Sequence, residues 1–211
     1  PLRKAFASAP DFLRRSRAAT LLATAYLKTL ELDQIYPMVP YLLTRGSLAA
    51  RSIAFNLAAL EAGDVLFEEE RYREAFWIHR LVYPHDEVQL RTELFLEQLQ
   101  RMVAEAQQDT PDPRRLMRLQ EWAADTEAEL QALRDQVENY DPELHYRIAR
   151  GYMEARRYRE GCELFLYLHR AGGVERAEGA LYLAFVCAAS VPSPGRAYEI
   201  ARRYMDEYPG G

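Results

Sequence analysis

The chain has 211 residues, of which 49% are hydrophobic and 28% are charged, and its formal net charge is −5. A mildly acidic chain without clusters of Lys and Arg does not supply the basic surface that nucleic-acid binding requires, so no nucleic-acid partner is expected. Val, Ile and Thr are sparse beside Ala, Leu, Glu and Arg, a balance that predicts an all-α fold. No apolar run reaches the roughly 18 residues that a membrane-spanning helix needs, which predicts no direct membrane insertion.

The first helical pair is predicted within residues 10–45, after a short tail. Asp11 is a candidate N-cap for the first helix of this pair. A second helix is expected through 36–43, shortened or distorted by Pro37 and Pro40. The pair reads as a degenerate repeat.

A clearer repeat is predicted over residues 47–85. Ser47 is a candidate cap for a helix over 48–69, and a partner helix begins at Tyr72 and ends before Pro84. These N-terminal repeats together make up the predicted segment 1–85.

Residues 86–140 follow a different pattern. Helices are predicted from Asp86 to about Gln107 and over 114–139, with a turn between them. Apolar residues recur at spacings of three and four on both helices: Phe95, Leu99, Met102 and Ala106, then Leu116, Leu119, Ala123, Thr126, Leu130, Leu133, Val137 and Tyr140. Such seams predict a long antiparallel helical hairpin inserted between repeats. The alternative is an ordinary repeat that matches poorly.

The C-terminal segment, 141–211, contains two further helix–turn–helix units. Gly161 and Ala197 occupy equivalent small-residue positions in the two units, 36 residues apart. A repeat of this length built from two antiparallel helices is typical of an α-solenoid. The fold class predicted for the whole chain is therefore an all-α solenoid of antiparallel helix pairs with an inserted hairpin.

The repeat units resemble tetratricopeptide repeats (TPRs). That family places a small residue on the first helix, a large residue three positions later, an aromatic residue near the start of the second helix, then Ala, and Pro at the repeat's end. The matching residues within 53–84 are Gly63, Leu66, Tyr72 and Ala75, with the Pro early at Pro84; within 142–173 they are Ala149, Tyr152, Tyr158 and Gly161, with no Pro; within 178–209 they are Phe185, Ala188, Pro194, Ala197 and Pro209. The large Phe185 and the missing aromatic at Pro194 depart from the pattern.

The resemblance implies a concave groove lined by the first helix of each repeat. Carried over by position, the groove residues are Leu60, Asp64, Phe67, Tyr146, Arg150, Met153, Tyr182 and Val186. Aromatic and Arg side chains there suit a peptide or a partner helix, and the alternative is that several of them only cover the adjoining helix. Family members that clamp a chaperone's terminal carboxylate use Lys and Asn in the groove, which these positions lack. Repeats that end in Tyr-Pro also resemble those of bacterial envelope proteins.

The cysteines and histidines, which are catalytic or metal-binding residues in many other proteins, are expected to have structural roles here. Cys162 and Cys187 are expected to be buried apolar residues, or a disulfide if the compartment is oxidising and the geometry allows it. The histidines, which are His79, His85, His145 and His169, have no metal-ligand spacing, and an interior imidazole is expected at His79 and His145. No catalytic motif is present, so we expect no enzyme, no metal and no cofactor. Trp122 lies beside the hairpin seam, either exposed for an interface or packed against the repeats.

Three hypotheses for function follow. The first is a non-catalytic scaffold that binds a partner protein or peptide in the groove. The second is a structural spacer or oligomerisation module of a larger cell-envelope protein, with self-association through 86–140. The third is a catalytic domain with a helical fold. The chain begins at Pro1 and ends at Pro209-Gly-Gly, which suggests a piece of a longer protein, with the bacterial periplasm or envelope favoured over the cytoplasm.

Overall fold

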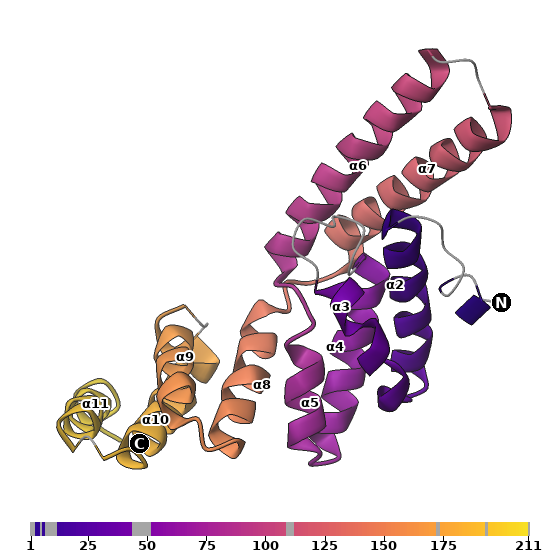
Figure 1. Cartoon of the computed structure of the whole chain (residues 1–211). Helices are drawn as coiled ribbons and strands as arrows, with labels where there is room; N and C mark the ends of the chain where they lie inside the picture. Colours follow the sequence, from indigo (N-terminus) through magenta and orange to yellow (C-terminus); the bar gives the residue numbers. More distant parts are fainter. Residues whose placement is uncertain are drawn as a thin grey trace. The chain divides into compact units, whose positions relative to one another are not determined.

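The chain is built from helices. The computed structural model describes residues 3–4, 6, 12–43, 52–108, 112–171, 174–192 and 194–210. These residues form ten α-helices and two short 3-10 helices, with no strand among them, so the predicted all-α class is confirmed (Figure 1). The elements are α2 (Phe12–Lys28), η1 (Leu32–Gln34), η2 (Tyr36–Met38), α3 (Val39–Leu42), α4 (Ile53–Glu68), α5 (Tyr72–His79), α6 (His85–Gln108), α7 (Pro113–Gln136), α8 (Asp141–Glu154), α9 (Tyr158–Ala171), α10 (Val174–Ala189) and α11 (Pro194–Glu207).

The chain divides into two compact units, each assembled from two separate stretches. Unit 1 contains residues 1–62 and 81–139, and unit 2 contains residues 63–80 and 140–211. Helix α4 therefore contributes its first part to unit 1 and its last part to unit 2.

The Pro-containing segment after α2 is only partly helical. The predicted helix over 36–43 is replaced by η2 and the single turn of α3, because Pro37 and Pro40 lack the N–H groups that a continuous helix would use. Leu42 and Met38 are nevertheless buried, so this segment still contributes to the core of unit 1.

Helix α4 begins later than the predicted start at residue 48. Ser52 precedes the helix, and its hydroxyl accepts a hydrogen bond of 3.3 Å from the backbone N–H of Phe55. This contact is that of an N-cap, so Ser52 caps α4. The predicted caps Ser47 and Asp11 lie outside the described residues.

Helix α5 ends at His79, well before Pro84. The backbone N–H of Tyr83 donates a 2.6 Å hydrogen bond to the side-chain oxygen of Asn56, which is buried. This hydrogen bond gives a partner to a buried backbone N–H that lies outside any helix. Leu81, Val82 and Tyr83 are therefore buried on a non-helical segment.

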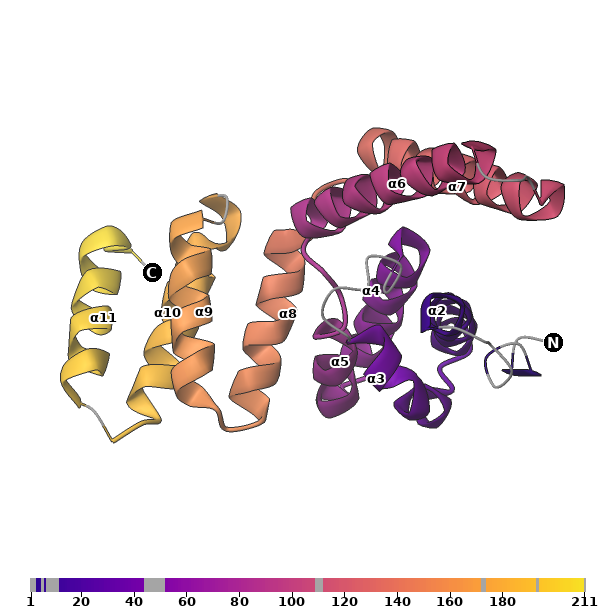
Figure 2. The ribbon, with the colours of Figure 1, turned by 45° about the horizontal axis from the view of Figure 1, so that its top comes forward.

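Helices α6 and α7 run side by side in opposite directions (Figures 1 and 2). Phe95, Leu99, Ala106 and Leu119 form a buried cluster between them. The second helix begins at Pro113, and the Asp112 side chain caps it by accepting from the N–H of Arg114 at 3.0 Å.

Two predicted seam residues of the second helix lie outside it. Helix α7 ends at Gln136, Val137 has an extended backbone, and Tyr140 immediately precedes α8. A helix continued through this point would place Pro142 in its interior, where the ring clashes with the carbonyl four residues earlier. The chain therefore breaks here and starts α8 with Pro142 in its first turn.

In unit 2, α5, α8, α9, α10 and α11 form a series in which each helix packs against the next (Figure 2). The core between α8, α9, α10 and α11 contains Ala149, Cys162, Phe165, Leu166, Leu168, Ala180, Leu181, Ala184, Cys187, Ala188 and Ile200. Gly161 lies close to its neighbours in this core: a Cβ there would be 3.3 Å from the Cys187 sulfur and 3.4 Å from the Ala149 carbonyl oxygen. A larger side chain at Gly161 would have to displace these neighbours, which stays a prediction for the predicted small-residue position.

The helices α2, α4 and α8 end in the same turn. Leu30, Glu70 and Arg156 each have a positive φ, of 54°, 60° and 58°. In each case the next residue's N–H bonds to the carbonyl five residues before it, at 2.8 to 2.9 Å. This is the Schellman motif, here without the usual Gly. The recurrence of one turn at three helix ends is a local structural repeat.

Candidate functional site

The predicted groove residue Asp64 lies in the unit 2 part of α4 and is held by two partners. Its carboxylate oxygen is 3.0 Å from Nε2 of His79 and 3.6 Å from Nε of Arg147. The imidazole is completely buried because Gly63 leaves room for it: a Cβ on Gly63 would lie 2.5 Å from the ring. The predicted interior position of His79 is confirmed, although its Nδ1 has no hydrogen-bond partner among the described residues.

Arg147 is the centre of this arrangement. Besides Asp64, its Nε contacts a carboxylate oxygen of Glu143 at 2.8 Å, and its guanidinium lies 4.3 Å from the centre of the Phe67 ring. The Arg147 side chain is only 15% exposed. Charged hydrogen bonds at low exposure are stronger than those in water, so this cluster fixes the side chains it joins.

The other carboxylate oxygen of Glu143 pairs with Arg176 on α10. The Arg176 guanidinium in turn lies 5.7 Å from the centre of the Tyr146 ring. Asp64, Arg147, Glu143 and Arg176 thus form a line of alternating charges from α4 through α8 to α10, named here the charge chain.

Three of the predicted groove residues are engaged in packing. Tyr146 and Met153 are half-buried against the core of unit 2, and the Tyr146 ring centre is 6.0 Å from that of Phe165. Phe67 is covered by Arg147. These three side chains therefore make packing contacts within unit 2. Leu60 is half-buried on the part of α4 that belongs to unit 1.

Two predicted groove residues, Arg150 and Tyr182, make few contacts with other side chains. Arg150 makes one long ion pair, 3.7 Å to Glu154, and its side chain is 25% exposed, while its Nε is buried and has no hydrogen-bond partner among the described residues. Tyr182 is 51% exposed on α10. Val186, one turn further along α10, is half-buried.

Tyr182 belongs to a group of three tyrosines. Its ring centre lies 6.1 Å from that of Tyr204, which lies 5.6 Å from that of Tyr208. The Tyr204 hydroxyl donates to the Glu178 carboxylate at 2.9 Å, and this hydrogen bond raises the pKa of Tyr204. The group presents aromatic surface with the Tyr204 hydroxyl held in place, which is suited to contact with another molecule.

Sequence reasoning missed Glu143, Arg147 and Arg176. The spacing of Glu143 and Arg147 by four residues was a signal for an ion pair along one helix. The contacts of Arg147 with Asp64 and of Glu143 with Arg176 carry no such signal, because those residues lie 83 and 33 residues apart in the sequence.

The cysteines and the remaining histidines take structural positions. Cys162 and Cys187 are free thiols, and burial raises the pKa of Cys187 to about 11 and also raises that of Cys162. The thiols are therefore protonated at neutral pH and poor nucleophiles. His169 is buried between the Ala177 carbonyl and Glu207, whereas His145 is half-buried, with its ring centre 5.5 Å from that of Tyr167.

Within the described ranges, no group of three His, Cys, Asp or Glu side chains is arranged to hold a metal ion. A search of the same ranges for a helix with the length and apolar character needed to cross a bilayer also finds none. Comparisons with protein-family models, curated proteins and solved structures give no match to this chain.

Proposed function

We propose that unit 2 is part of a TPR-like α-solenoid and that it acts as a non-catalytic scaffold for a partner protein. Three features support the solenoid. Successive helices pack in chain order from α8 to α11, Gly161 and Ala197 lie 36 residues apart, and α4 and α8 end in the same Schellman turn before the next helix of their pair.

The proposed binding role rests on one observation: the side chains of the charge chain are paired with one another, whereas neighbouring side chains on the same helices make few contacts. The charge chain fixes side chains on α4, α8 and α10, while Tyr182 on α10 is exposed and Arg150 on α8 makes only one long ion pair. Arg and Tyr on a rigid surface are the residue types that dominate binding energy at protein interfaces. Arg150 would donate hydrogen bonds to a carboxylate or backbone carbonyl of the partner, and Tyr182 would contact an apolar side chain.

The test is affinity capture on the immobilised chain from cells that express it naturally, followed by calorimetry with the captured partner. We expect the double variant Arg150→Ala, Tyr182→Ala to weaken binding at least tenfold, since each hot-spot residue contributes about 2 kcal/mol or more. The matched control is Arg159→Ala, Tyr167→Ala, which removes exposed residues of the same types from α9. If both double variants lost the same binding affinity, or if the Arg150 and Tyr182 variant lost none, these two residues would be excluded as contacts with the partner.

A second candidate function is self-association through α6 and α7. Leu90 and Leu94 are 55% and 42% exposed one turn apart on α6, and Met117 is 53% exposed on α7. Exposed apolar residues on one helix face suit a contact between helices. In the same experiment, capture of only the parent protein, with no effect of the Arg150 and Tyr182 changes, would favour this function.

A further inference from the structure

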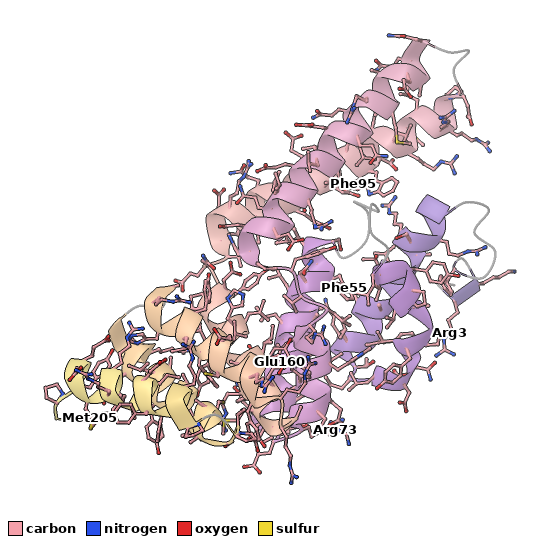
Figure 3. The ribbon with its side chains drawn as sticks, turned by 60° about the vertical axis from the view of Figure 1, so that its left-hand side comes forward. Arg3, Phe55, Arg73, Phe95, Glu160 and Met205 are labelled. Carbon is pink, nitrogen blue, oxygen red and sulfur yellow. The ribbon has the colours of Figure 1, made fainter. Side chains whose placement is uncertain are left out.

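Unit 1 contains a cavity that the proposed groove does not use. It has a volume of about 490 Å³ and lies between α2, the start of α4, α6 and α7. Its apolar lining includes Leu21, Ile53, Phe95 and Trp122. Phe95, labelled in Figure 3, lies on the side of the α6–α7 pair that faces α2. Cavities of roughly 300–1,000 Å³ with an apolar lining and a few polar groups are typical of small-molecule sites.

Three charged residues line the cavity: Arg17 from α2, and Asp125 and Glu129 from α7. The Arg17 guanidinium lies 4.1 Å from the centre of the Trp122 ring and makes no ion pair with either carboxylate. In the part of the chain that the structure describes, Asp125 and Glu129 have no hydrogen-bond or ion-pair partner. Two carboxylates thus share the cavity with one cation, which attracts both of them without forming an ion pair, so the charged lining residues carry an excess of negative charge.

The threonines of the lining are also acceptors. The hydroxyls of Thr20, Thr92 and Thr126 donate to the carbonyls of Ser16, Val88 and Trp122 on their own helices, at 2.7 to 3.0 Å. A hydroxyl has one proton, so these oxygens have only lone pairs left for another group. The Arg17 guanidinium still has its N–H donors while it stacks on Trp122, and it supplies the positive charge among the described lining residues.

The surroundings of the charged groups also affect their ionisation. Burial and the nearby Asp125 raise the pKa of Glu129, while burial lowers the pKa of Arg17. The raised pKa of Glu129 and the lowered pKa of Arg17 both mean that the cavity does not fully stabilise the charged form of either side chain. No titratable residue from α4 or α6 lines it.

We propose that this cavity binds a small organic cation with an apolar body, such as an arylalkyl or alkyl amine. The ammonium group has three N–H donors and a positive charge, which the carboxylates of Glu129 and Asp125 and the threonine oxygens accept. The apolar body lies against Phe95, Ile53 and Leu21. An anion of the same shape would face two carboxylates, and a neutral alcohol would leave at least one of them without a partner.

The test is NMR titration of the full chain, observed at the indole N–H signals of its two tryptophans. Trp122 lines the cavity, whereas Trp77 belongs to unit 2 and serves as an internal reference. The probes are 2-phenylethylamine, 2-phenylethanol and 3-phenylpropanoate. We expect the amine to shift the Trp122 signal alone and to bind about tenfold more tightly than the alcohol, the usual effect of a charge-assisted hydrogen bond. We expect the carboxylate to bind most weakly.

A pair of variants on α7 completes the test. Glu129→Gln keeps the shape of the side chain and removes its charge, and we expect it to weaken binding of the amine about tenfold. Glu127→Gln removes a charge from an exposed position on the same helix and should leave binding unchanged. The free Trp122 signal reports whether the fold of each variant is intact. Absence of a Trp122 shift with the amine, equal binding of amine and alcohol, or equal effects of the two variants would overturn the proposal.

Discussion

At the scale of single residues, Asp64 and Glu129 are both partly buried carboxylates, but their surroundings differ. Asp64 has His79 and Arg147 within 3.0 and 3.6 Å. Glu129 has no such partner, and burial with the nearby Asp125 raises its pKa. A buried carboxylate with ion-pair partners holds those side chains in place. A buried carboxylate without an ion pair destabilises the fold and favours binding of a cation.

The raised pKa of Glu129 gives a prediction about stability. A carboxyl whose pKa is higher in the folded than in the unfolded chain stabilises the fold below its unfolded pKa, and this contribution is lost as the pH rises through the folded pKa. The uncharged Glu129→Gln variant should therefore have a higher free energy of unfolding than the wild type at pH 7 and an equal one at about pH 4, near the unfolded pKa of Glu or below. Urea denaturation at the two pH values measures this. A variant less stable than the wild type at pH 7 would contradict the account.

At the scale of helices, close packing depends on particular glycines. A Cβ on Gly151 in α8 would overlap the ring of Phe76 on α5, and the Phe76 ring in turn lies 4.9 Å from that of Tyr152. Gly179 on α10 has nothing within 4 Å of the same position. The helical propensity of the two sites is equal, so only packing distinguishes them.

We therefore expect Gly151→Ala and Gly179→Ala to have opposite effects. The first should lower the free energy of unfolding by about 1–3 kcal/mol, because the α5–α8 contact must open. The second should raise it by roughly 0.5–1 kcal/mol, the usual gain of Ala over Gly inside a helix. Chemical denaturation of both variants measures the difference. A stabilising Gly151→Ala change would mean that α5 and α8 do not pack as described.

At the scale of the whole molecule, the two units have separate cores. The cluster around Phe165 belongs to unit 2, and the clusters around Leu99 and Leu133 belong to unit 1. Trp77 and Trp122 also fall in different units. Contacts that are dense within a unit make that unit unfold cooperatively.

This division predicts two separable transitions. With Trp122→Phe, the remaining Trp77 reports on unit 2, and adding Gly151→Ala should lower its urea midpoint. With Trp77→Phe, the remaining Trp122 reports on unit 1, and the same change should leave its midpoint unaltered. Fluorescence of the four proteins gives the answer. Equal shifts at both tryptophans would instead indicate one cooperative unit linked through α4.

The sequence alone determined that the chain is helical and where most of its helices lie. These predictions use local properties: helix propensity, the three- and four-residue spacing of apolar residues, and the positions of Pro. Each of these properties affects only the residues close to it in the sequence. Even so, the start of α4 and the ends of α5 and α7 were predicted less well, since Ser52, the Asn56–Tyr83 hydrogen bond and Pro142 decided them. Of the predicted groove residues, Tyr182 is exposed, Arg150 makes one long ion pair, and Tyr146 and Met153 pack against the core.

Only the tertiary structure decided which helices meet. It joined residues 63–80 with 140–211, brought Arg147 to Asp64, and enclosed the cavity beside Glu129. The periodicity of a helix shows which of its faces is apolar, but many other helices could cover that face equally well. Which helix covers that face depends on the shape and charge of side chains far apart in the sequence, such as Gly151 against Phe76 and Glu143 against Arg176. No local sequence pattern predicts these contacts.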